Sequence, residues 1–553
     1  MGPGRANQRV HFTATARMRR SRRKPATWAM ITVENPSESA KRTNVLYRTK
    51  ARNDHMAAGH PPSDITTRSR ARARAASLLK LPEAAIEDDL VDFLVTDQGD
   101  ALLRARAGSG KTTALAIKAA YLTQDLGIKP ETIMMLTFNN AAARSLEQRL
   151  SAFGVPGGIR VRTFHALGQR IVRAHFGDSR RPVFDEKSED GLAIAQMMQE
   201  CIDEIVKKEF YFFCASKMRT HYGKRKEYVE SVGREALVSA VQFLRARGYG
   251  LQNRFENAWE VAGPIGGTAM KVIVAFENRL RDARLLDATS VLQAAAWSLE
   301  REIEKGVMRQ SDAHGVDWIF IDEFQDVSLP YMRLVAAVRD INGMINIQGV
   351  GDDWQAINGF AGADLDYFRD AAKHLDNPKQ LDLLRNRRSG AKIVNWGNAV
   401  MDAIGADDGP AILYPGNGQG EVNTSKVTAK RDLFLAAKRL AELVDLSLSD
   451  VALIARKWKV GDHTMYRLRI QVEALLREKG YKGSVTGITA HGSKGLEWDQ
   501  VLLLDDGSFP MEHPSRPILE ALIPEDEYLR EEACLKHVAG TRARKRLDVV
   551  DMT

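Results

Sequence analysis

The 553-residue chain contains little cysteine and no long apolar run. Its three cysteines, Cys201, Cys214 and Cys534, are widely spaced and match no metal-ligand pattern, which indicates a reducing compartment. No apolar run approaches the roughly 18 residues that a membrane-spanning helix needs. The sequence therefore predicts neither a membrane protein nor a cysteine-based metal site, and its length predicts more than one domain.

Acidic residues are scarce in the first 80 positions, which hold 18 Lys/Arg and 4 Asp/Glu, a net charge of +14. The rest of the chain carries 62 basic and 67 acidic residues, so the overall charge of +9 comes from this arm. Basic runs such as RMRRSRRK and the lack of apolar periodicity predict that residues 1–80 are disordered. Three interpretations stay open: a tail that binds nucleic acid, a transit peptide, or residues ahead of a true start at Met30 or Met56.

A glycine-rich segment, ARAGSGKTTAL at residues 105–115, lies between an apolar run typical of a buried strand and a helical pattern. Gly108 and Gly110 would let the backbone turn its N–H groups around an anion. Lys111 would reach the β- and γ-phosphates of a nucleotide, and Thr112 would offer its hydroxyl to Mg²⁺. The order of strand, loop, Lys-Thr and helix favours a phosphate-binding loop over a chance Gly/Ser turn.

Two further apolar runs end in polar residues suited to nucleotide hydrolysis. The run VDWIFIDEFQD at residues 316–326 contains Asp322, which would hold the Mg²⁺ shell, and Glu323, which would polarise the attacking water. The simpler alternative is a solvated acidic turn after a strand. The run MINIQGVGDDWQAINGF contains Gln355, whose amide could sense a γ-phosphate because it both donates and accepts hydrogen bonds. Strand-like and helical segments alternate along the chain, which predicts α/β layers.

An ordered series of motifs resembles the superfamily-one DNA helicases of the UvrD/Rep type. The motifs that carry the resemblance are, in chain order, ARAGSGKTT, LTFNNAAARSLEQRL (136–150), RTFHALG (162–168), LLDATSVL (285–292), FIDEFQDVS (320–328), GDDWQAINGFAGAD (351–364), LLRNRRS (383–389), TAHGSKGLEWDQVLLL (489–504) and VAGTRARKRL (538–547). Within that family, the GDDWQ motif and the compactness of the chain most resemble the helicase-IV-like branch.

The resemblance implies an α/β fold of two RecA-like P-loop lobes, with a helical insertion in the first lobe and a much reduced insertion in the second. The implied divisions are the arm at 1–80, the first lobe at 81–168 and 316–375, the mostly helical insertion at 169–315 and the second lobe at 376–553. Typical members carry a large subdomain between the segments that correspond here to VALIARK (451–457) and TAHGSKG. The intervening chain has room for one helix and a strand, which is too little for an independent domain of at least about 50 residues.

The same resemblance implies a site for ATP and Mg²⁺ between the lobes. Arg388 and Arg542 resemble arginine fingers, which neutralise charge on the transferring phosphoryl group. The implied catalytic residues are Lys111, Glu323, Gln355, Arg388 and Arg542. The implied nucleotide contacts are Gly108, Ser109, Gly110, Lys111, Thr112, Thr113 and Glu497, and the implied metal contacts are Thr112 and Asp322.

Single-stranded DNA is the implied substrate, with contacts from both lobes. Aromatic and hydroxyl side chains suit a sequence-tolerant track, because stacking on a ring is worth about 1–3 kcal/mol per base. The expected contacts are Thr137, Phe138, Asn139, Thr163, Phe164, His165, Phe360, Thr489 and His491. Core packing is the competing interpretation for Phe138 and Phe164 taken singly.

Several positions depart from the family pattern. In the third motif, Asn358 replaces a Tyr and Ala361 replaces an Arg, while Phe360 keeps one stacking ring. Arg387 stands where a Tyr commonly stacks on the adenine, and a guanidinium can stack as well. The segment LPEAAIEDD lies where the family has a Gln before the P-loop, and it contains none.

A basic and aromatic stretch at residues 207–227 falls within the helical insertion. It includes Lys208, Tyr211, Lys217 and Lys224. Two interpretations carry equal weight: a surface that faces duplex DNA or a partner, and the solvated basic face of a helical bundle.

The predicted function is that of an ATP-dependent 3′-to-5′ single-stranded DNA translocase or helicase, located in the cytoplasm with the nucleoid. Its expected partners are single-stranded DNA and junctions with duplex, with a second copy or another protein as a further candidate and no membrane. One alternative is a translocase that strips proteins but separates strands poorly. The other is an ATP-gated DNA-binding subunit of a larger defence or mobile-element complex.

Overall fold

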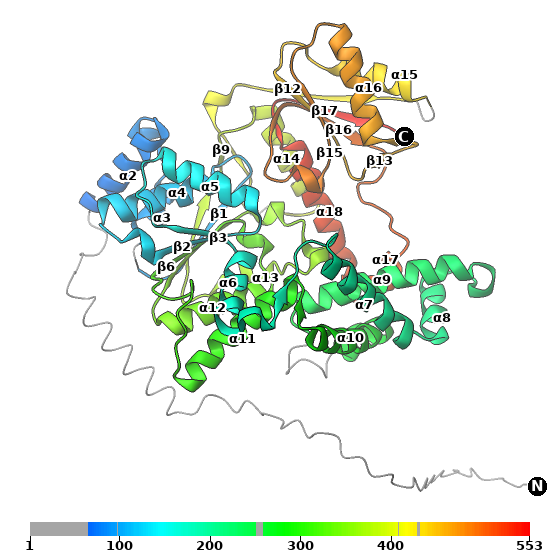
Figure 1. The fold of residues 1–553 in the computed structure, drawn as a ribbon. Coiled ribbons are helices and arrows are strands. Elements are labelled where there is room, and N and C mark those ends of the chain that lie inside the picture. The colour runs from blue at the N-terminus through cyan, green and yellow to red at the C-terminus, as the bar shows by residue number, and fades with distance from the viewer. Residues whose placement is uncertain (1–64, 97, 250–257, 407–408, 429–431) are drawn as a thin grey trace, which may run out of the picture. The chain divides into compact units, whose positions relative to one another are not determined.

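Helices and parallel strands alternate along the part of the chain that the structure describes (Figure 1). The computed structural model describes residues 65–96, 98–249, 258–406, 409–428 and 432–553. Residues 1–64 of the predicted arm lie outside these ranges, so their disorder stays a prediction. Among the helices of the described ranges, none is both long and apolar enough to cross a membrane.

The first lobe is built on six strands, all paired in parallel, in the order β3-β2-β6-β7-β1-β8. β2 and β6 read IMMLT and WIFI and are buried along their whole length, as strands covered on both faces must be. The six strands are β1 (Ala101–Ala105), β2 (Ile133–Thr137), β3 (Arg160–Thr163), β6 (Trp318–Ile321), β7 (Asn346–Gly351) and β8 (Lys379–Leu383).

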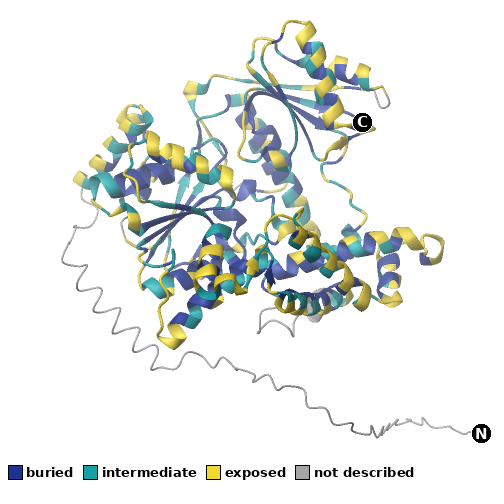
Figure 2. Ribbon diagram, viewed as in Figure 1, coloured by how far each residue is buried: buried dark blue, intermediate teal, exposed yellow. Residues whose placement is uncertain are grey.

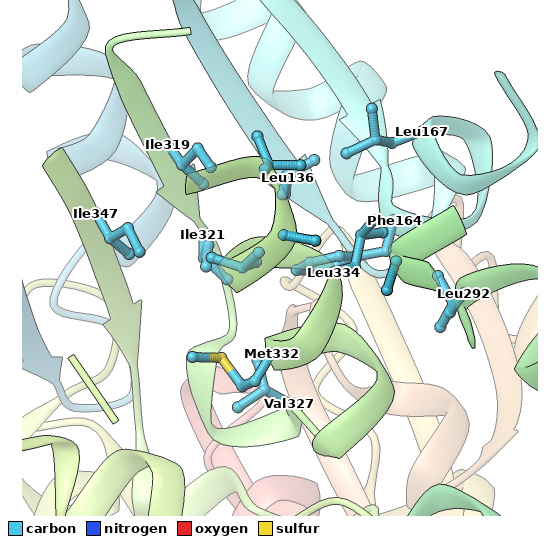
Figure 3. Close-up of a cluster of buried hydrophobic side chains, with 14 of the residues drawn as sticks. Leu136, Phe164, Leu167, Leu292, Ile319, Ile321, Val327, Met332, Leu334 and Ile347 are labelled. Carbon is cyan, nitrogen blue, oxygen red and sulfur yellow. The ribbon is translucent and has the colours of Figure 1, made fainter. Parts of the chain in front are cut away.

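Helices cover both faces of this sheet, and alternate residues of each strand enter the two layers. Ile319 and Ile321 pack in one layer with α6, α11 and α12, close to Phe164 (Figure 3). Trp318 and Phe320 pack in the other layer with α3, α4 and α5. Figure 2 shows the strands as buried and the outward helix faces as exposed. The helices are α3 (Asp88–Val95), α4 (Lys111–Ala120), α5 (Asn140–Ala152), α6 (Phe164–Phe176), α11 (Ala288–Lys305) and α12 (Leu329–Asn342).

The last part of the predicted arm is a packed helix, α2 (Ile65–Leu79). Its residues Ala71, Ala75 and Ala76 are buried in the layer that contains α3 and α4. Arg74 Nε lies 2.6 Å from Asp125 Oδ2. The prediction of a disordered arm over residues 1–80 is therefore wrong for its last turns, because alanines one helical turn apart form an apolar stripe between the arginines.

The helical insertion leaves the first lobe after α6 and returns before α11. The paired strands β4 (Arg181–Pro182) and β5 (Leu285–Leu286) bracket it. It is shorter than the predicted range 169–315, because α6 and α11 both pack in the core of the first lobe. Its helices are α7 (Glu189–Ile205), α8 (Lys208–Lys217), α9 (Lys226–Ala246) and α10 (Ala258–Ala283), and they enclose a separate apolar core.

The second lobe holds five parallel strands in the order β11-β17-β16-β12-β15. Between β12 and β15 the chain has a short hairpin, β13 (Lys459–Val460) with β14 (His463–Thr464), and one helix. The much reduced insertion is thus confirmed. The remaining elements are β11 (Glu421–Lys426), β12 (Asp450–Ala455), β15 (Ser484–Thr489), β16 (Trp498–Asp505), β17 (Ala543–Asp551), α14 (Ala391–Asp402), α15 (Leu433–Leu443), α16 (Met465–Glu478) and α18 (Glu525–Gly540).

The boundary between the lobes lies later than predicted. β8 pairs along its whole length with β1, with Lys379 opposite Ala101 and Leu383 opposite Ala105. This strand completes the first sheet, so the second lobe begins after residue 383 and the boundary predicted at 375 is wrong. The motif LLRNRRS therefore begins on the edge strand of one lobe and leads into the other.

Residues 507–524, here called the strap, connect β16 to α18 and carry the short helix α17 (Arg516–Leu519). Ile518 and Leu522 are buried in the apolar core of the insertion. His513 Nε2 also lies 3.3 Å from a carboxylate oxygen of Glu235 on α9. A segment of the second lobe thus completes the core of the first lobe's insertion.

Two truncated proteins test whether α2 belongs to the fold. A protein that starts at residue 65 keeps α2 and should melt at the temperature of the full chain. A protein that starts at residue 81 loses the three buried alanines and the Arg74–Asp125 pair, so it should melt several degrees lower. Circular dichroism during heating measures both, and equal melting temperatures for the two truncations would count against a stabilising role for α2.

Candidate nucleotide site and strand-binding surface

The glycine-rich loop joins β1 to α4 and forms the turn that the sequence predicts. Gly110 precedes α4 with φ 97°, and Gly108 has φ 74°, both in the left-handed region that favours glycine. A Cβ on Gly108 would lie 2.6 Å from Asn386 Oδ1 and 2.8 Å from Arg388 Cβ. The carbonyl of Gly108 accepts a hydrogen bond of 2.8 Å from Arg387 N. The loop is therefore in direct contact with the NRRS segment of the second lobe.

The predicted metal ligands meet at the start of α4. Thr112 Oγ1 donates to Asp322 Oδ2 over 2.8 Å. Burial, and then the charge of Glu323, raises the pKa of Asp322 to about 6. A hydroxyl and a carboxylate oxygen are hard ligands of the kind that Mg²⁺ prefers, so the pair fits that ion. Thr113, the next residue, accepts a hydrogen bond from Arg149.

Glu323 has the geometry of a held general base. Its backbone has φ 55°, a strained conformation for a residue with a side chain. Gln325 Nε2 donates to Glu323 Oε2 over 2.7 Å and fixes the carboxylate. Burial opposes ionisation, but Lys111 and Lys494 outweigh it and hold the pKa of Glu323 below its usual value. The carboxylate is thus ionised near neutral pH and able to orient a water.

Gln355 is connected to both lobes. Its Nε2 donates to Asp352 Oδ2 over 2.6 Å, and its Oε1 accepts a hydrogen bond of 3.2 Å from Arg542 Nη2. Asp352 Oδ2 lies 4.0 Å from Lys111 Nζ. Arg106 neutralises Asp352 on the other side, with 2.7 Å between Nη1 and Oδ1. The predicted γ-phosphate sensor therefore lies between the P-loop lysine and the predicted finger Arg542.

The predicted groups of the second lobe face the same site. Arg542 is 1% exposed, and burial, together with the nearby charge of Arg388, lowers its pKa to about 9. Arg388 Nε donates to Glu497 Oε2 over 2.7 Å. Glu497 is also 3.4 Å from Arg544 Nη1, so in this structure it pairs with cations of its own lobe.

Lys494 is a site residue that the sequence interpretation missed. Its Nζ donates to Asp326 Oδ2 over 2.5 Å and to the carbonyl of Gln355 over 3.1 Å, which joins the second lobe to two segments of the first. Burial would lower the pKa of Lys494, but Asp326 and Glu323 raise it. Lys494 lies inside the TAHGSKGLEW motif, so the sequence did contain a pattern that could have identified it.

Two buried polar atoms at the site are left for a ligand. Ser109 Oγ and Arg388 Nη1 have no hydrogen-bond partner among the described residues. Buried polar atoms normally have one, and phosphate oxygens would supply acceptors for both. The residues present therefore fit the phosphate chain of a nucleotide.

Arg387, at the predicted base-stacking position, contacts other residues of the protein. Its guanidinium lies 4.7 Å from the ring centroid of Tyr414, and Nη2 donates to Glu87 Oε1 over 2.9 Å. Glu87 comes from the LPEAAIEDD segment, which lacks the expected Gln. Tyr414 is an aromatic ring at this place that the motifs did not indicate, because it lies outside all of them.

Three of the residues predicted to contact DNA are buried and have structural roles instead. Phe164 and Thr137 have no exposed surface, and Thr163 is 9% exposed. Thr163 Oγ1 accepts from Ala166 N over 3.1 Å and caps α6, while Phe164 packs in the core (Figure 3). Their prediction as side chains that touch DNA is wrong, and core packing holds for Phe164.

The other first-lobe positions lie closer to the surface. Phe138 is partly buried, with its ring 5.1 Å from that of Tyr331, and His165 is 5.9 Å from the same tyrosine. His165 is also 5.7 Å from the exposed ring of Phe184. Asn139 is exposed, and its Oδ1 caps α5 by accepting from the backbone. These rings form an aromatic group at the ends of β2 and β3.

A second aromatic pair joins the lobes. The ring of Phe360 is 52% exposed and lies 5.5 Å from that of His491. Burial and the charge of Arg456 lower the pKa of His491 to about 4, so its ring is neutral near pH 7. Thr489 Oγ1 accepts from Gly492 N over 3.2 Å and shapes the turn before the histidine.

Two family models match the chain over most of its length. The model of the UvrD/REP helicase N-terminal domain matches residues 89–376, and that of the UvrD-like helicase C-terminal domain matches residues 316–552. The chain belongs to the UvrD/REP helicase family. The resemblance that the motifs carry and the α/β class with two lobes are thereby confirmed.

Several curated proteins similar to this chain are named as DNA helicases. DNA helicase IV of Escherichia coli (strain K12) is 26% identical over 485 residues, which cover 82% of this chain and 66% of the relative. DNA helicase II of the same strain is 26% identical over 351 residues, which cover 60% of this chain and 44% of the relative. A probable DNA helicase of Mycoplasma pneumoniae is 23% identical over 479 residues, which cover 83% of this chain and 81% of the relative. The chain thus spans about two thirds of helicase IV and under half of helicase II.

Substitution of Glu323 should separate binding from hydrolysis in this UvrD/REP chain. Glu323→Gln keeps the shape but cannot take a proton, so ATP turnover should fall by about 10²–10⁴-fold while ATP binding persists. Lys111→Ala should lose both, because it removes the phosphate clamp. Phosphate release and binding of a fluorescent ATP analogue measure the two properties, with Glu478→Gln on an exposed helix face as the control. Wild-type turnover by Glu323→Gln would refute its catalytic role.

The two arginines should act mainly on the rate. Arg388→Ala and Arg542→Ala should each lower ATP turnover by about 10³-fold or more, because finger charge counts most in the transition state. ATP affinity should fall far less. Arg542→Lys keeps the charge at the buried position and controls for loss of packing. If affinity and turnover fell equally, the arginines would be holding the ground state instead.

Proposed function

We propose that the chain is an ATP-dependent motor that moves 3′ to 5′ along single-stranded DNA. The single observation that carries this proposal is the convergence of both lobes on one site. Thr112 and Asp322 of the first lobe bond to each other, and Arg542 and Lys494 of the second lobe bond to Gln355 and Asp326 of the first. Such an arrangement makes hydrolysis depend on lobe closure, which is the coupling that a motor needs.

The proposed chemistry assigns each side chain one task. Lys111 clamps the phosphates, and Thr112 with Asp322 would hold Mg²⁺, which would neutralise charge on the β- and γ-oxygens. Glu323, held by Gln325, orients the attacking water and takes its proton. Arg542 stabilises the developing charge, and its bond to Gln355 reports whether the lobes are closed.

The proposed DNA track follows the surface aromatic groups. Phe138 with Tyr331 lies at the carboxyl ends of the first lobe's strands, and Phe360 with His491 joins the lobes. Rings spaced along a path bind any base sequence, because every base has a face to stack. His491 contributes as a neutral ring rather than as a cation.

Residues 1–64, the part of the predicted arm outside the described ranges, would make a separate electrostatic contribution. Residues 1–64 hold 13 Lys/Arg and 4 Asp/Glu, which is +9, and residues 65–553 hold 67 of each and are neutral. An arm that neutralises phosphates raises affinity in a salt-dependent way, so we assign it auxiliary DNA binding. We propose that the protein acts on DNA in the cytoplasm, in association with the nucleoid.

The alternative of an ATP-gated binder needs a weak or idle hydrolytic site. The complete set of base, sensor and arginines favours turnover instead. ATPase rate with and without single-stranded DNA decides between the two. Strong stimulation supports the motor, and a low rate that DNA leaves unchanged supports the gated binder.

Strand separation requires a surface that holds the junction, and the insertion offers one. Tyr211 is buried and belongs to the insertion core, which corrects its prediction as a surface contact. Phe212, beside it, is 50% exposed, with Lys208 Nζ 5.7 Å from its ring centroid. Lys217 and Lys224 are exposed as well. We propose that this surface contacts duplex ahead of the motor.

Unwinding should therefore be weak and should depend on the insertion surface. Each step melts a base pair against about 1.4 kcal/mol of stacking, and the reduced second insertion leaves few groups to hold the junction. The isolated monomer should displace a protein block from a 5′ end efficiently but unwind a long duplex poorly, and only from a 3′ overhang. Replacing Lys208, Lys217 and Lys224 together by Ala should lower unwinding about fivefold or more.

The control for this set is the triple replacement of Lys426, Lys479 and Lys482, exposed lysines of the second lobe, by Ala. Its unwinding rate should match the wild type. Stopped-flow separation of a labelled duplex measures the rate, and single-stranded DNA-stimulated ATPase should stay unchanged in both triple variants. Robust unwinding of long duplex by a verified monomer, or loading from a 5′ overhang, would refute the proposal.

A further inference from the structure

The segment at residues 358–362, here called the Phe360 loop, is anchored on the helical insertion. Gly362 has φ 88°, and a Cβ there would lie 2.1 Å from the Cβ of Ala246 at the end of α9. Arg247 Nη1 lies 2.6 Å from Asp364 Oδ2 just beyond the loop. The loop is thus pressed against the insertion at its last residue, so that end moves with the first lobe.

The opposite end of the loop is held by the second lobe through one side chain. Phe360 N donates to Glu531 Oε1 on α18 over 3.4 Å, and Gly359 N also donates to this carboxylate. A Cβ on Gly359 would lie 2.7 Å from Glu531 Oε2, and the other atoms nearest to it also belong to Glu531. The backbone of Gly359 does not have a positive φ, so its conformation alone would permit a side chain. The close approach of Glu531 is what excludes one there.

Glu531 relies on these backbone groups for its hydrogen bonds. Burial, with the charge of Glu532, raises the pKa of Glu531 to about 7, although the N–H groups of Phe360 and Gly359 and the charge of Arg456 lower it. Arg456, the nearby cation, makes its close ion pair with Glu532, at 2.6 Å. Ala361 supplies no guanidinium to the loop. With no guanidinium at position 361, the carboxyl group of Glu531 instead accepts from the main chain of the loop.

The Phe360 loop also lies near Gln325, the residue that holds the proposed catalytic base Glu323. A cavity of about 150 Å³ is lined by Gly359, Glu531 and Gln325, among other residues. Gln325 is the residue that holds Glu323. Asn358, at the start of the loop, lies close enough to Asp326 to lower its pKa, and Asp326 pairs with Lys494. A movement of α18 would therefore shift both the ring of Phe360 and the residues around the hydrolytic centre.

We propose, resting on the proposed function, that Glu531 is a positioning residue that sets the ring of Phe360 on the DNA according to the position of the second lobe. It acts through the N–H groups of Gly359 and Phe360. When α18 moves with its lobe, the carboxylate moves the loop about its anchor on α9. The DNA-stacking ring and the arginine Arg542, which comes after α18 in the chain, then change together.

Variants of the two contacting residues test this role. Glu531→Ala should lower the single-stranded DNA-stimulated ATPase rate about tenfold, the size of a typical coupling between sites, and change the DNA affinity of the nucleotide-free protein less than about threefold. Glu531→Gln keeps an acceptor oxygen and should retain most of the stimulated rate. Asp526→Ala removes an exposed carboxylate of the same helix and should match the wild type.

Gly359→Ala provides a second, independent variant. Its Cβ displaces the carboxylate, so it should lower the stimulated rate as Glu531→Ala does. In the double variant the Cβ has room, so Gly359→Ala should cause no further loss once Glu531 is Ala. Such non-additivity distinguishes a shared contact from two separate structural defects.

The possible outcomes are distinct. Additive losses in the double variant, a wild-type stimulated rate for Glu531→Ala, or equal losses of DNA affinity and rate would each overturn the role of Glu531 while leaving the motor intact. A wild-type protein whose ATPase does not respond to DNA would overturn the proposed function, and the positioning role with it. Melting temperatures of all variants identify any that fail to fold, in which case Glu531→Gln and Gly359→Ala decide.

Discussion

The first lobe's parallel strands bring their carboxyl ends to one edge of a sheet, and the site is assembled from the residues at those ends. β1 leads into the P-loop, β6 into Asp322 and Glu323, and β7 into Asp352 and Gln355. Parallel pairing forces these segments together even though they are far apart in sequence. The second lobe presents its opposite edge, since Glu497 directly precedes β16 and Arg542 directly precedes β17. The proposed nucleotide site thus lies between the carboxyl edge of one sheet and the amino edge of the other.

Charge compensation holds these two edges together. Lys494 is a buried cation of the second lobe whose carboxylate partner, Asp326, lies in the first lobe, and the buried Arg542 donates to the neutral amide of Gln355 there. Removing Asp326 would leave the charge of Lys494 uncompensated, which costs about 3–5 kcal/mol. The same groups lower the pKa of Glu323 and keep it ionised, with Lys111. The electrostatics that join the lobes therefore also keep the proposed catalytic base ionised.

The sequence alone predicted the parts of the site that are local. The P-loop, Asp322, Glu323 and Gln355 each come shortly after an apolar strand, so pattern and chemistry coincide in one short segment. Positions that depend on helix docking were not predictable in the same way. Phe164, the first residue of α6, is buried because it packs with residues of α11 and α12, which no local pattern states.

Other features were present in the sequence but were outweighed by stronger signals. The arginines of α2 favoured disorder, although Ala71 and Ala75, one turn apart, marked a buried face. β8 reads KQLDL, a weak strand pattern at a sheet edge, so the lobe boundary was placed too early. The contact between Glu531 and the Phe360 loop joins residues 171 positions apart, and only the folded chain brings them together.

The strap has a consequence for the order in which this chain can fold. The insertion's core draws on residues from Cys201 to Leu285, but it is completed by Ile518 and Leu522. During synthesis the ribosome delivers the insertion helices more than 200 residues before the side chains that cover them. The apolar side chains that these two residues cover therefore stay uncovered while residues 286–517 are made, and exposed apolar surface of this kind is a binding site for chaperones and a risk for aggregation. The insertion's core is complete only once the strap has been made and has docked on it.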